Sequence, residues 1–229
     1  MLLLEEKLEE GSVCYFDSSN IYACKYNANT KQLAIIFKGA GQYVYEDIIA
    51  FTPPNSAEKY VEIGAWKGKS ICYAAVAIIN SGKNITIDSV DTWEGSPGEP
   101  VLMNDDSIKN NTLYDEFIKN IEPVKHIVTP VKMPSVEAAK LYEDKSLFFV
   151  FIDGSHLYEA VKEDILAWLP KVKSGGFIGG HDIDQIEEFN GVRKAVDELI
   201  GEKNIIIYNK GWASWMHSCL LYTSDAADE

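Results

Sequence analysis

The chain is poor in positive charge and lacks any long apolar run. Its 229 residues include 21 Lys or Arg against 35 Asp or Glu, a formal net charge of −14. This balance argues against nucleic acid or an anionic membrane surface as the main partner. Because no run of about 18 apolar residues occurs, no transmembrane helix is expected. The start, MLLLEEKLEE, becomes acidic after a short apolar stretch and is unlike a secretory signal. We therefore expect a cytoplasmic protein.

Cysteine is scarce as well. Cys14, Cys24, Cys72 and Cys219 have no metal-type spacing, which predicts free thiols in a reducing compartment. The last segment, CLLYTSDAADE at 219–229, resembles the translation of a sequencing-library adapter. The gene would then be of metagenomic origin and the tail artefactual; the alternative is a short polar tail. In either case we leave it out of the predicted fold.

The first 50 residues predict a small β-rich appendage. Segments 12–17, 20–26, 32–38 and 42–46 are rich in aromatic and β-branched residues, and NANTK and GAG supply turns between them. Residues 18–49 resemble the first half of the KTSC domain, and we assign no function to them. The residues that carry this resemblance are Ser18, Ser19, Tyr26, Leu33, Phe37, Gly41, Tyr43 and Tyr45.

From residue 51 to residue 218 the pattern alternates between strands and helices. Such alternation predicts an α/β fold, a mostly parallel, doubly wound sheet built through right-handed crossovers. The continuous apolar run LFFVFID is typical of a central strand buried on both faces. The expected strands are 60–63, 85–91, 127–131, 147–153 and 176–180, with 205–208 and 213–216 as an antiparallel edge. The expected helices are 71–79, 112–121, 136–142, 158–169 and 192–200.

The stretch YVEIGAWKGKS at 60–70 is the most informative segment. Gly64 and Gly68 lie between a predicted strand and a predicted helix, where α/β sheets bind nucleotide-like ligands. The spacing matches neither the dinucleotide fingerprint nor the P-loop. Glu62 suits ribose hydroxyls or a cation, and Ser70 would cap the helix or contact the ligand. The alternative is a turn without a ligand.

Three other predicted strands also end in polar side chains. Asp91, Asp153 and the pair His181–Asp182 follow apolar strands. Because ligands bind at the carboxyl ends of such strands, these side chains predict one site. Asp91 suits hydrogen bonds to ribose hydroxyls; its alternative role is to cap the loop 92–97.

Four segments together resemble class I S-adenosylmethionine-dependent methyltransferases, most closely the small O-methyltransferases. They are YVEIGAWKGKS, the VDTW of 90–93, the block 151–182 and GVRKAVDEL from 191. The resemblance implies a Rossmann-like sheet of seven strands with the last strands antiparallel, and S-adenosylmethionine as cofactor.

The resemblance also implies a donor site. Gly64 and its neighbours would line the methionine part, Asp91 would hold the ribose, and Trp93 and Ser135 would contact the adenine. A loop tryptophan can equally be a packing residue. The complete set implied for the cofactor is Glu62, Gly64, Ala65, Gly68, Ser70, Asp91, Trp93, Ser135 and Asp153.

Catalysis is expected at the far strand ends. Asp153, His181 and Asp182 fall where metal-dependent members hold a divalent ion. Histidine in that set disfavours magnesium and is better tolerated by manganese, zinc or iron. Without a metal, His181 or His156 would be the general base. The alternatives are a surface role for His156 and a buried hydrogen bond from His181 to Asp182.

The acceptor is expected to be a small molecule. The long loop 94–111 would hang over the site as a lid or specificity element. Because this loop is acidic, it favours a neutral or cationic acceptor such as a sugar hydroxyl. A homodimer is left open. Two other functions remain: a nucleotide-dependent oxidoreductase or sugar-modifying enzyme on a similar sheet, and a non-catalytic binding module.

Overall fold

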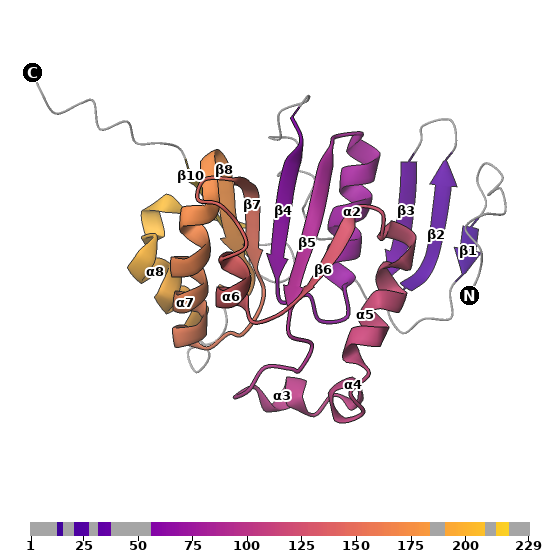
Figure 1. Ribbon diagram of the computed structural model, residues 1–229, viewed down its shortest axis with the longest axis horizontal. Helices are drawn as coiled ribbons and strands as arrows, with labels where there is room; N and C mark the ends of the chain where they lie inside the picture. Colours follow the sequence, from indigo (N-terminus) through magenta and orange to yellow (C-terminus); the bar gives the residue numbers. More distant parts are fainter. Residues whose placement is uncertain are drawn as a thin grey trace, which may run out of the picture.

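A seven-stranded mixed sheet forms the centre of the protein. The computed structural model describes residues 13–15, 21–27, 32–37, 56–183, 191–208 and 214–219. The strands follow the order β6-β5-β4-β7-β8-β10-β9 (Figure 1). Their bounds are β4 (Glu58–Ile63), β5 (Ile85–Asp91), β6 (Val128–Lys132), β7 (Leu147–Ile152), β8 (Val172–Gly180), β9 (Ile206–Tyr208) and β10 (Ser214–Cys219).

The strand order reverses between β4 and β7. From β4 the chain proceeds outward through β5 to β6, and then returns to β7 on the other side of β4. The pairs among these strands, and the pair of β7 with β8, are parallel, whereas β10 is antiparallel to both β8 and β9. The predicted doubly wound sheet with an antiparallel C-terminal hairpin is confirmed. A ligand is expected at the carboxyl ends of β4 and β7, where the order reverses.

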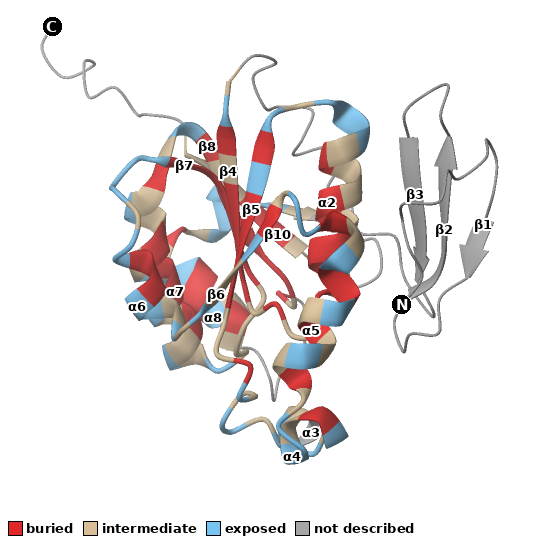
Figure 2. Cartoon of the chain, turned by 45° about the vertical axis from the view of Figure 1, so that its right-hand side comes forward, coloured by how far each residue is buried: buried red, intermediate tan, exposed pale blue. Residues whose placement is uncertain are grey.

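Helices cover both faces of the sheet. On one face α2 and α5 pack over one hydrophobic core, and on the other α6, α7 and α8 pack over a second (Figure 2). The helices are α2 (Lys69–Ser81), α3 (Pro100–Met103), α4 (Asp106–Lys109), α5 (Leu113–Ile121), α6 (Ser135–Ala139), α7 (Tyr158–Trp168) and α8 (Gly191–Leu199). Short 3-10 turns occupy Glu122–Val124, Leu169–Lys171 and Glu202–Asn204.

Strand alternation assigns each side chain to one of these cores. In β4, Tyr60 belongs to the core under α2 and α5, while Val61 and Ile63 belong to the other. All six residues of β7 are buried, as expected for a parallel strand with helices on both faces.

Several element boundaries differ from the sequence prediction, among them those of β8 and β10. Strand β8 begins at Val172, which lies opposite Leu147, rather than at 176. Beside it the polar residue Lys173 pairs with the buried Glu58, Nζ to Oε1 2.6 Å. Strand β10 extends to Cys219, which lies opposite Gly176. The expected boundary of the tail therefore falls inside a strand. Cys72 and Cys219 are free thiols.

A three-stranded antiparallel sheet precedes this domain. It consists of β1 (Val13–Tyr15), β2 (Ile21–Asn27) and β3 (Gln32–Phe37) in sequential order, and β3 lies beside α2 (Figure 1). Three of the expected β segments are confirmed; the fourth, 42–46, lies outside the described residues. The resemblance to the KTSC domain stays a prediction. Across the part of the chain that is described, we find no helix long and apolar enough to cross a membrane.

The turn after β4 supplies a test of the fold. Gly64 has φ +88°, and a Cβ there would lie 2.0 Å from the backbone oxygen of Asp153. Gly82 also has a positive φ, +67°, but a Cβ would meet nothing within 4 Å. We expect Gly82→Ala to cost about 1 kcal/mol from backbone strain. Gly64→Ala should cost a further 1–3 kcal/mol or so, because the added methyl overpacks the turn. Urea unfolding of both variants checks this, and equal losses would contradict it.

Candidate active site

Both glycines of the first turn are required by the protein's own packing. Gly64 leaves room for the backbone of Asp153 at the end of β7. Gly68, with φ +81°, is the N-cap of α2, and a Cβ there would lie 3.0 Å from the ring of Phe117. Ser70, expected as a cap, instead lies inside the helix and is buried. The turn is thus pressed between β7 and α5, while its backbone remains at the carboxyl end of β4. Ala65 is buried there as well.

Glu62 lies beneath this turn and is completely buried. Its carboxyl oxygens accept hydrogen bonds from the hydroxyls of Tyr60 and Ser70. Burial raises the pKa of Glu62 from 4.5 to about 8, although the two hydroxyls oppose the shift. The group is therefore mainly neutral at pH 7. In this structure its side chain supports the turn from inside, and the predicted contact of Glu62 with a ribose or a cation stays a prediction.

Asp91 joins the turns that follow β4 and β5. Its Oδ2 accepts a hydrogen bond from the backbone N–H of Trp66 at 2.8 Å, and its Oδ1 from that of Trp93 at 2.7 Å. Both tryptophans have positive φ, 48° and 55°, a conformation that costs a bulky residue about 1–2 kcal/mol. The carboxylate offsets this strain. The backbone N–H groups of Thr92 and Ala65 also stabilise the charged form of this carboxylate.

Trp93 is a packing residue in this structure. Its side chain is buried, and its ring centroid lies 4.8 Å from that of Tyr114 and 4.7 Å from that of Phe117. Its indole N–H donates to the backbone oxygen of Trp66 at 2.9 Å. The structure thus favours the alternative that the sequence left open, and we do not carry forward the adenine contact.

Ser135 is likewise occupied by protein contacts. Its Oγ accepts a hydrogen bond from the indole of Trp168 at 2.8 Å, and its hydroxyl interacts with the carboxylate of Asp164. These bonds join the first turn of α6 to α7. Sequence position alone suggested an adenine contact for Ser135, and the structure shows a link between two helices.

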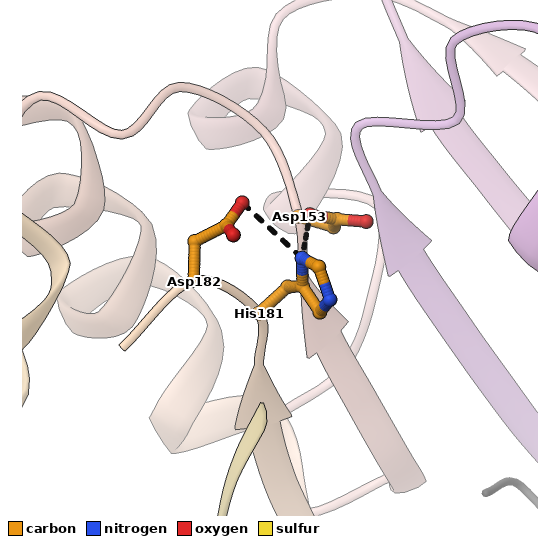
Figure 3. Close-up of side chains that lie close together, drawn as sticks. All are labelled: Asp153, His181 and Asp182. Carbon is orange, nitrogen blue, oxygen red and sulfur yellow. Dashed lines mark ion pairs between the residues drawn. The ribbon is translucent and has the colours of Figure 1, made fainter. Parts of the chain in front are cut away.

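The carboxyl ends of β7 and β8 bring Asp153, His181 and Asp182 together (Figure 3). The Nδ1 atom of His181 lies 3.6 Å from Oδ1 of Asp153 and 3.2 Å from Oδ2 of Asp182. Asp182 has φ 59°, a conformation that few residues other than glycine adopt and that is often found at functional sites. We call these three residues the catalytic cluster, after the role that the sequence predicts for them.

Burial, hydrogen bonds and neighbouring charges shift the pKa values of all three cluster residues away from their ordinary values. Burial raises the pKa of Asp153 to about 6, against the charge of His181. Burial lowers the pKa of His181, but the hydrogen bond to Asp182 and the charges of both aspartates outweigh it and raise the pKa overall. Burial also opposes ionisation of Asp182, yet hydrogen bonds from His156 and His181 hold its pKa well below the ordinary value. Asp182 is thus the fixed negative charge of the cluster.

His156 lies at the edge of the cluster, between two carboxylates. Its Nδ1 lies 2.8 Å from Oε2 of Glu99, and its Nε2 lies 2.9 Å from Oδ2 of Asp182. Hydrogen bonds to Asp182 and Glu99 raise the pKa of His156 to about 10. Both ring nitrogens of His156 are engaged by carboxylates, which favours His181 over His156 as the predicted general base. The side chain of His156 is only 24% exposed, which also argues against a surface role.

Glu99 is the site residue that the sequence did not reveal. Burial would raise its pKa, but hydrogen bonds from His156 and Ser96 lower it to about 2. It lies in the acidic loop expected to cover the site, where no local pattern distinguishes it from neighbouring acids. Its proximity to His156 depends on how the loop folds back.

The catalytic cluster suits a divalent metal ion. One imidazole nitrogen and two carboxylate oxygens lie within 4.8 Å of one another. Ligands at right angles around an ion, each about 2.1 Å away, are separated by about 3 Å. The separations between His181 and the two aspartates are close to this value. The mixed nitrogen and oxygen set fits manganese, iron or zinc better than magnesium.

Comparison with known proteins identifies the domain. A family described as a methyltransferase domain matches residues 61–183. The matched region runs from β4 to Ile183 after β8 and covers more than half of the chain. The chain belongs to this methyltransferase family. The catalytic cluster and the turns after β4 and β5 all lie inside the matched region.

Solved structures share the fold of this methyltransferase domain. The O-methyltransferase NovP has a TM-score of 0.59 at 16% identity, over 77% of this chain and 78% of that one. The calicheamicin methyltransferase CalS11 has a TM-score of 0.55 at 14% identity, over 75% and 76%. Cofactor-bound Rv0187 from MTB has a TM-score of 0.53 at 13% identity, over 77% and 80%. At these identities the likeness establishes the fold.

A relative known by sequence is the uncharacterized protein y4gI of Sinorhizobium fredii (strain NBRC 101917 / NGR234). It is 24% identical over 141 residues, which are 62% of this chain. The matched region is 15% of the length of that relative. The activity of that whole relative therefore gives no guide to the activity of this chain.

Replacing Asp91 tests its two roles. Asp91→Ala leaves the N–H groups of Trp66 and Trp93 without their acceptor, which should cost about 1–3 kcal/mol of stability for each group left unsatisfied. We also expect the affinity for S-adenosylmethionine to fall at least tenfold, roughly 1.4 kcal/mol. Asp115→Ala, at an exposed acid of α5, is the control. Calorimetry and thermal unfolding measure both effects, and unchanged affinity with lower stability would leave Asp91 a purely structural role.

Glu62 predicts a pH dependence of stability. Its pKa is about 8 when folded and near 4.5 when unfolded, so the folded state holds more protons between these values. Its contribution is fully present below about pH 4.5 and is lost as pH rises towards 8, by at most about 1.4 kcal/mol per pH unit. Between pH 5 and pH 8 the free energy of unfolding of Glu62→Gln should fall by less than that of the original protein. Urea unfolding across this range checks the slope, and equal slopes for both proteins would refute it.

Proposed function

We propose that this protein transfers a methyl group from S-adenosylmethionine to a hydroxyl group of a small molecule. The observation that carries the proposal is the catalytic cluster at the ends of β7 and β8, beside the glycine turn of β4 in a methyltransferase domain. Two proteins of similar fold support the oxygen acceptor by their own descriptions. NovP is described as an O-methyltransferase, and CalS11 as a TDP-rhamnose 3'-O-methyltransferase.

The donor would lie along the turns after β4 and β5. The backbone from Gly64 to Gly68 leads into the N-terminus of α2, and the carboxylate of Asp91, at the end of β5, would accept hydrogen bonds from the ribose hydroxyls. The methionine end would then point from the turn of β4 towards Asp153, because the two backbones touch at Gly64. The sulfonium would then lie at the edge of the catalytic cluster.

The chemical step needs alignment and removal of one proton. The acceptor oxygen attacks the methyl carbon in line with the carbon–sulfur bond, and the sulfur leaves with the bonding electrons as neutral S-adenosylhomocysteine. His181 takes the hydroxyl proton, held in place by Asp153 and Asp182 on its Nδ1 side. A divalent ion held by the three cluster residues would lower the pKa of the hydroxyl instead.

The acceptor is proposed to be neutral or cationic. The net charge of the chain is −14, and Glu99, Asp153 and Asp182 all face the catalytic region. An anionic acceptor would be repelled by these carboxylates, whereas a sugar hydroxyl or a catechol would not. A polar hydroxyl compound is therefore the first class to screen.

Donor binding and turnover test the proposal directly. Calorimetry should show binding of S-adenosylmethionine and little binding of NAD. Labelled methyl transfer is then screened against sugars, catechols and small amines with EDTA, magnesium, manganese or zinc. Turnover that requires the ion assigns activation of the hydroxyl to the metal, and turnover in EDTA assigns it to His181. Absence of donor binding would overturn the proposal.

One substitution tests the role of His181 in the reaction. His181→Ala should lower kcat at least about 100-fold, because proton removal or ion binding is lost, with donor affinity within twofold of the original protein. His126→Ala, at an exposed histidine before β6 on the opposite edge of the sheet, should leave kcat unchanged. Equal effects of the two substitutions would exclude His181 from the reaction.

A further inference from the structure

The segment between β5 and α5, residues 92–112, extends beyond the carboxyl ends of the parallel strands. It contains the short helices α3 and α4, which lie past the ends of β4 and β5 (Figure 1). Besides the contacts of Trp93 at its start, two ion pairs at different points hold it. Lys67, in the donor turn, pairs with Asp105 at 3.0 Å, and Glu99 pairs with His156 at 2.8 Å. The segment is thus attached to both the donor side and the catalytic side.

The Glu99 contact uses both oxygens of one carboxylate. Oε2 accepts from Nδ1 of His156, and Oε1 accepts from the backbone N–H of His156 at 3.0 Å. Ser96 donates to Oε1 at 2.7 Å from within the same segment. The side chain of Glu99 is only 16% exposed. A carboxylate bound through two N–H groups is fixed in orientation, unlike a surface ion pair with one contact.

His156 transmits this contact to the catalytic cluster. Its Nε2 reaches Oδ2 of Asp182, and the same oxygen lies 3.2 Å from Nδ1 of His181. Three connecting segments therefore meet in one chain of charged groups: β5 to α5 through Glu99, β7 to α7 through His156, and β8 to α8 through Asp182. The position of Asp182 beside His181 depends on a group held by the loop.

Close backbone packing supports the same junction. A Cβ on Gly98 would lie 3.0 Å from Cδ1 of Leu157, and a Cβ on Gly191 would lie 2.3 Å from the backbone oxygen of His156. The stretch 156–157 is therefore packed between the loop and the start of α8. His156 has little freedom to move independently of Glu99.

We propose that Glu99 and His156 are positioning residues for methyl transfer, forming a clasp that seats segment 92–112 over the acceptor side and orients Asp182 against His181. The inference rests on the proposed function, since it concerns the same reaction. The contact between Glu99 and His156 that holds the segment in place is then also the contact that aligns the catalytic cluster. The Lys67 contact keeps the donor side of the segment in place when the clasp is removed.

The clasp makes specific kinetic predictions. Glu99→Ala and His156→Ala should each lower kcat about 10- to 100-fold, as loss of an orienting partner does at metal and catalytic sites. The affinity for S-adenosylmethionine should stay within twofold. Glu99→Gln keeps a neutral acceptor at the same place and should recover part of the loss. Glu94→Ala, at an exposed acid of the same segment, is the matched control and should keep kcat within twofold.

A double-mutant cycle and hydrogen exchange complete the test. If the two residues act as one unit, Glu99→Ala with His156→Ala should cost about as much as either alone. Amide exchange of peptides from 92–112 should increase in Glu99→Ala and stay unchanged in Glu94→Ala. This second readout needs no turnover, so it tests the clasp even if the original protein transfers no methyl group to any acceptor.

Three outcomes would overturn the inference. One is additive losses of kcat in the double variant, which would mean that the two residues act separately. Another is faster exchange of the segment with unchanged kcat, which would mean that the contact holds the loop but positions nothing. The third is a loss of kcat that only accompanies weaker donor binding, which would point to general destabilisation.

Discussion

The geometry of the turns after β4 and β5 depends on one carboxylate that accepts hydrogen bonds from backbone N–H groups of both turns. Asp91 ends β5 and holds Trp66 and Trp93, two bulky residues in a left-handed conformation that each would avoid alone. Trp93 then closes the arrangement by donating its indole N–H to the backbone oxygen of Trp66. The turns after neighbouring parallel strands are thereby fixed side by side. Burial raises the pKa of Asp91 overall, and the backbone N–H groups oppose this shift, so they offset part of the cost of burying the charge that keeps both turns in place.

The sheet could be predicted from sequence because its periodicity is strong. The run at 147–152 is apolar at every position and is buried on both faces, and the order of strands and helices followed from alternation alone. The start of β8 could not be predicted in this way, because Lys173 looks like a loop residue until its partner Glu58 is known. That partner lies in β4, on the far side of β7 in the sheet. Local pattern carries no information about such a pair.

The site was predictable where topology determines position and not where packing determines orientation. Parallel strands must bring Asp91, Asp153 and His181 to one edge, and they do. The roles of Trp93 and Ser135 depend on Phe117 and Trp168, which belong to other helices. For Glu62, however, the alternation of side chains along the strand could have predicted its environment. It lies two residues after Tyr60 and therefore faces the core under α2, where Ser70 also lies. Only Glu99 had no signal in sequence, because its partner is brought to it by loop folding.

The charges of the catalytic region alternate in a way that suits a cationic donor. Glu99 and Asp182 flank the imidazolium of His156, so this part carries one negative charge overall. Asp153 adds a further, partly protonated carboxylate, and Glu62 beneath it is mainly neutral, which reduces repulsion between the two acids. A sulfonium is attracted to such a site, whereas the thioether formed after methyl transfer has no charge. Because attraction is lost only when the methyl group leaves, the same electrostatics that would hold the proposed donor would also favour release of its product.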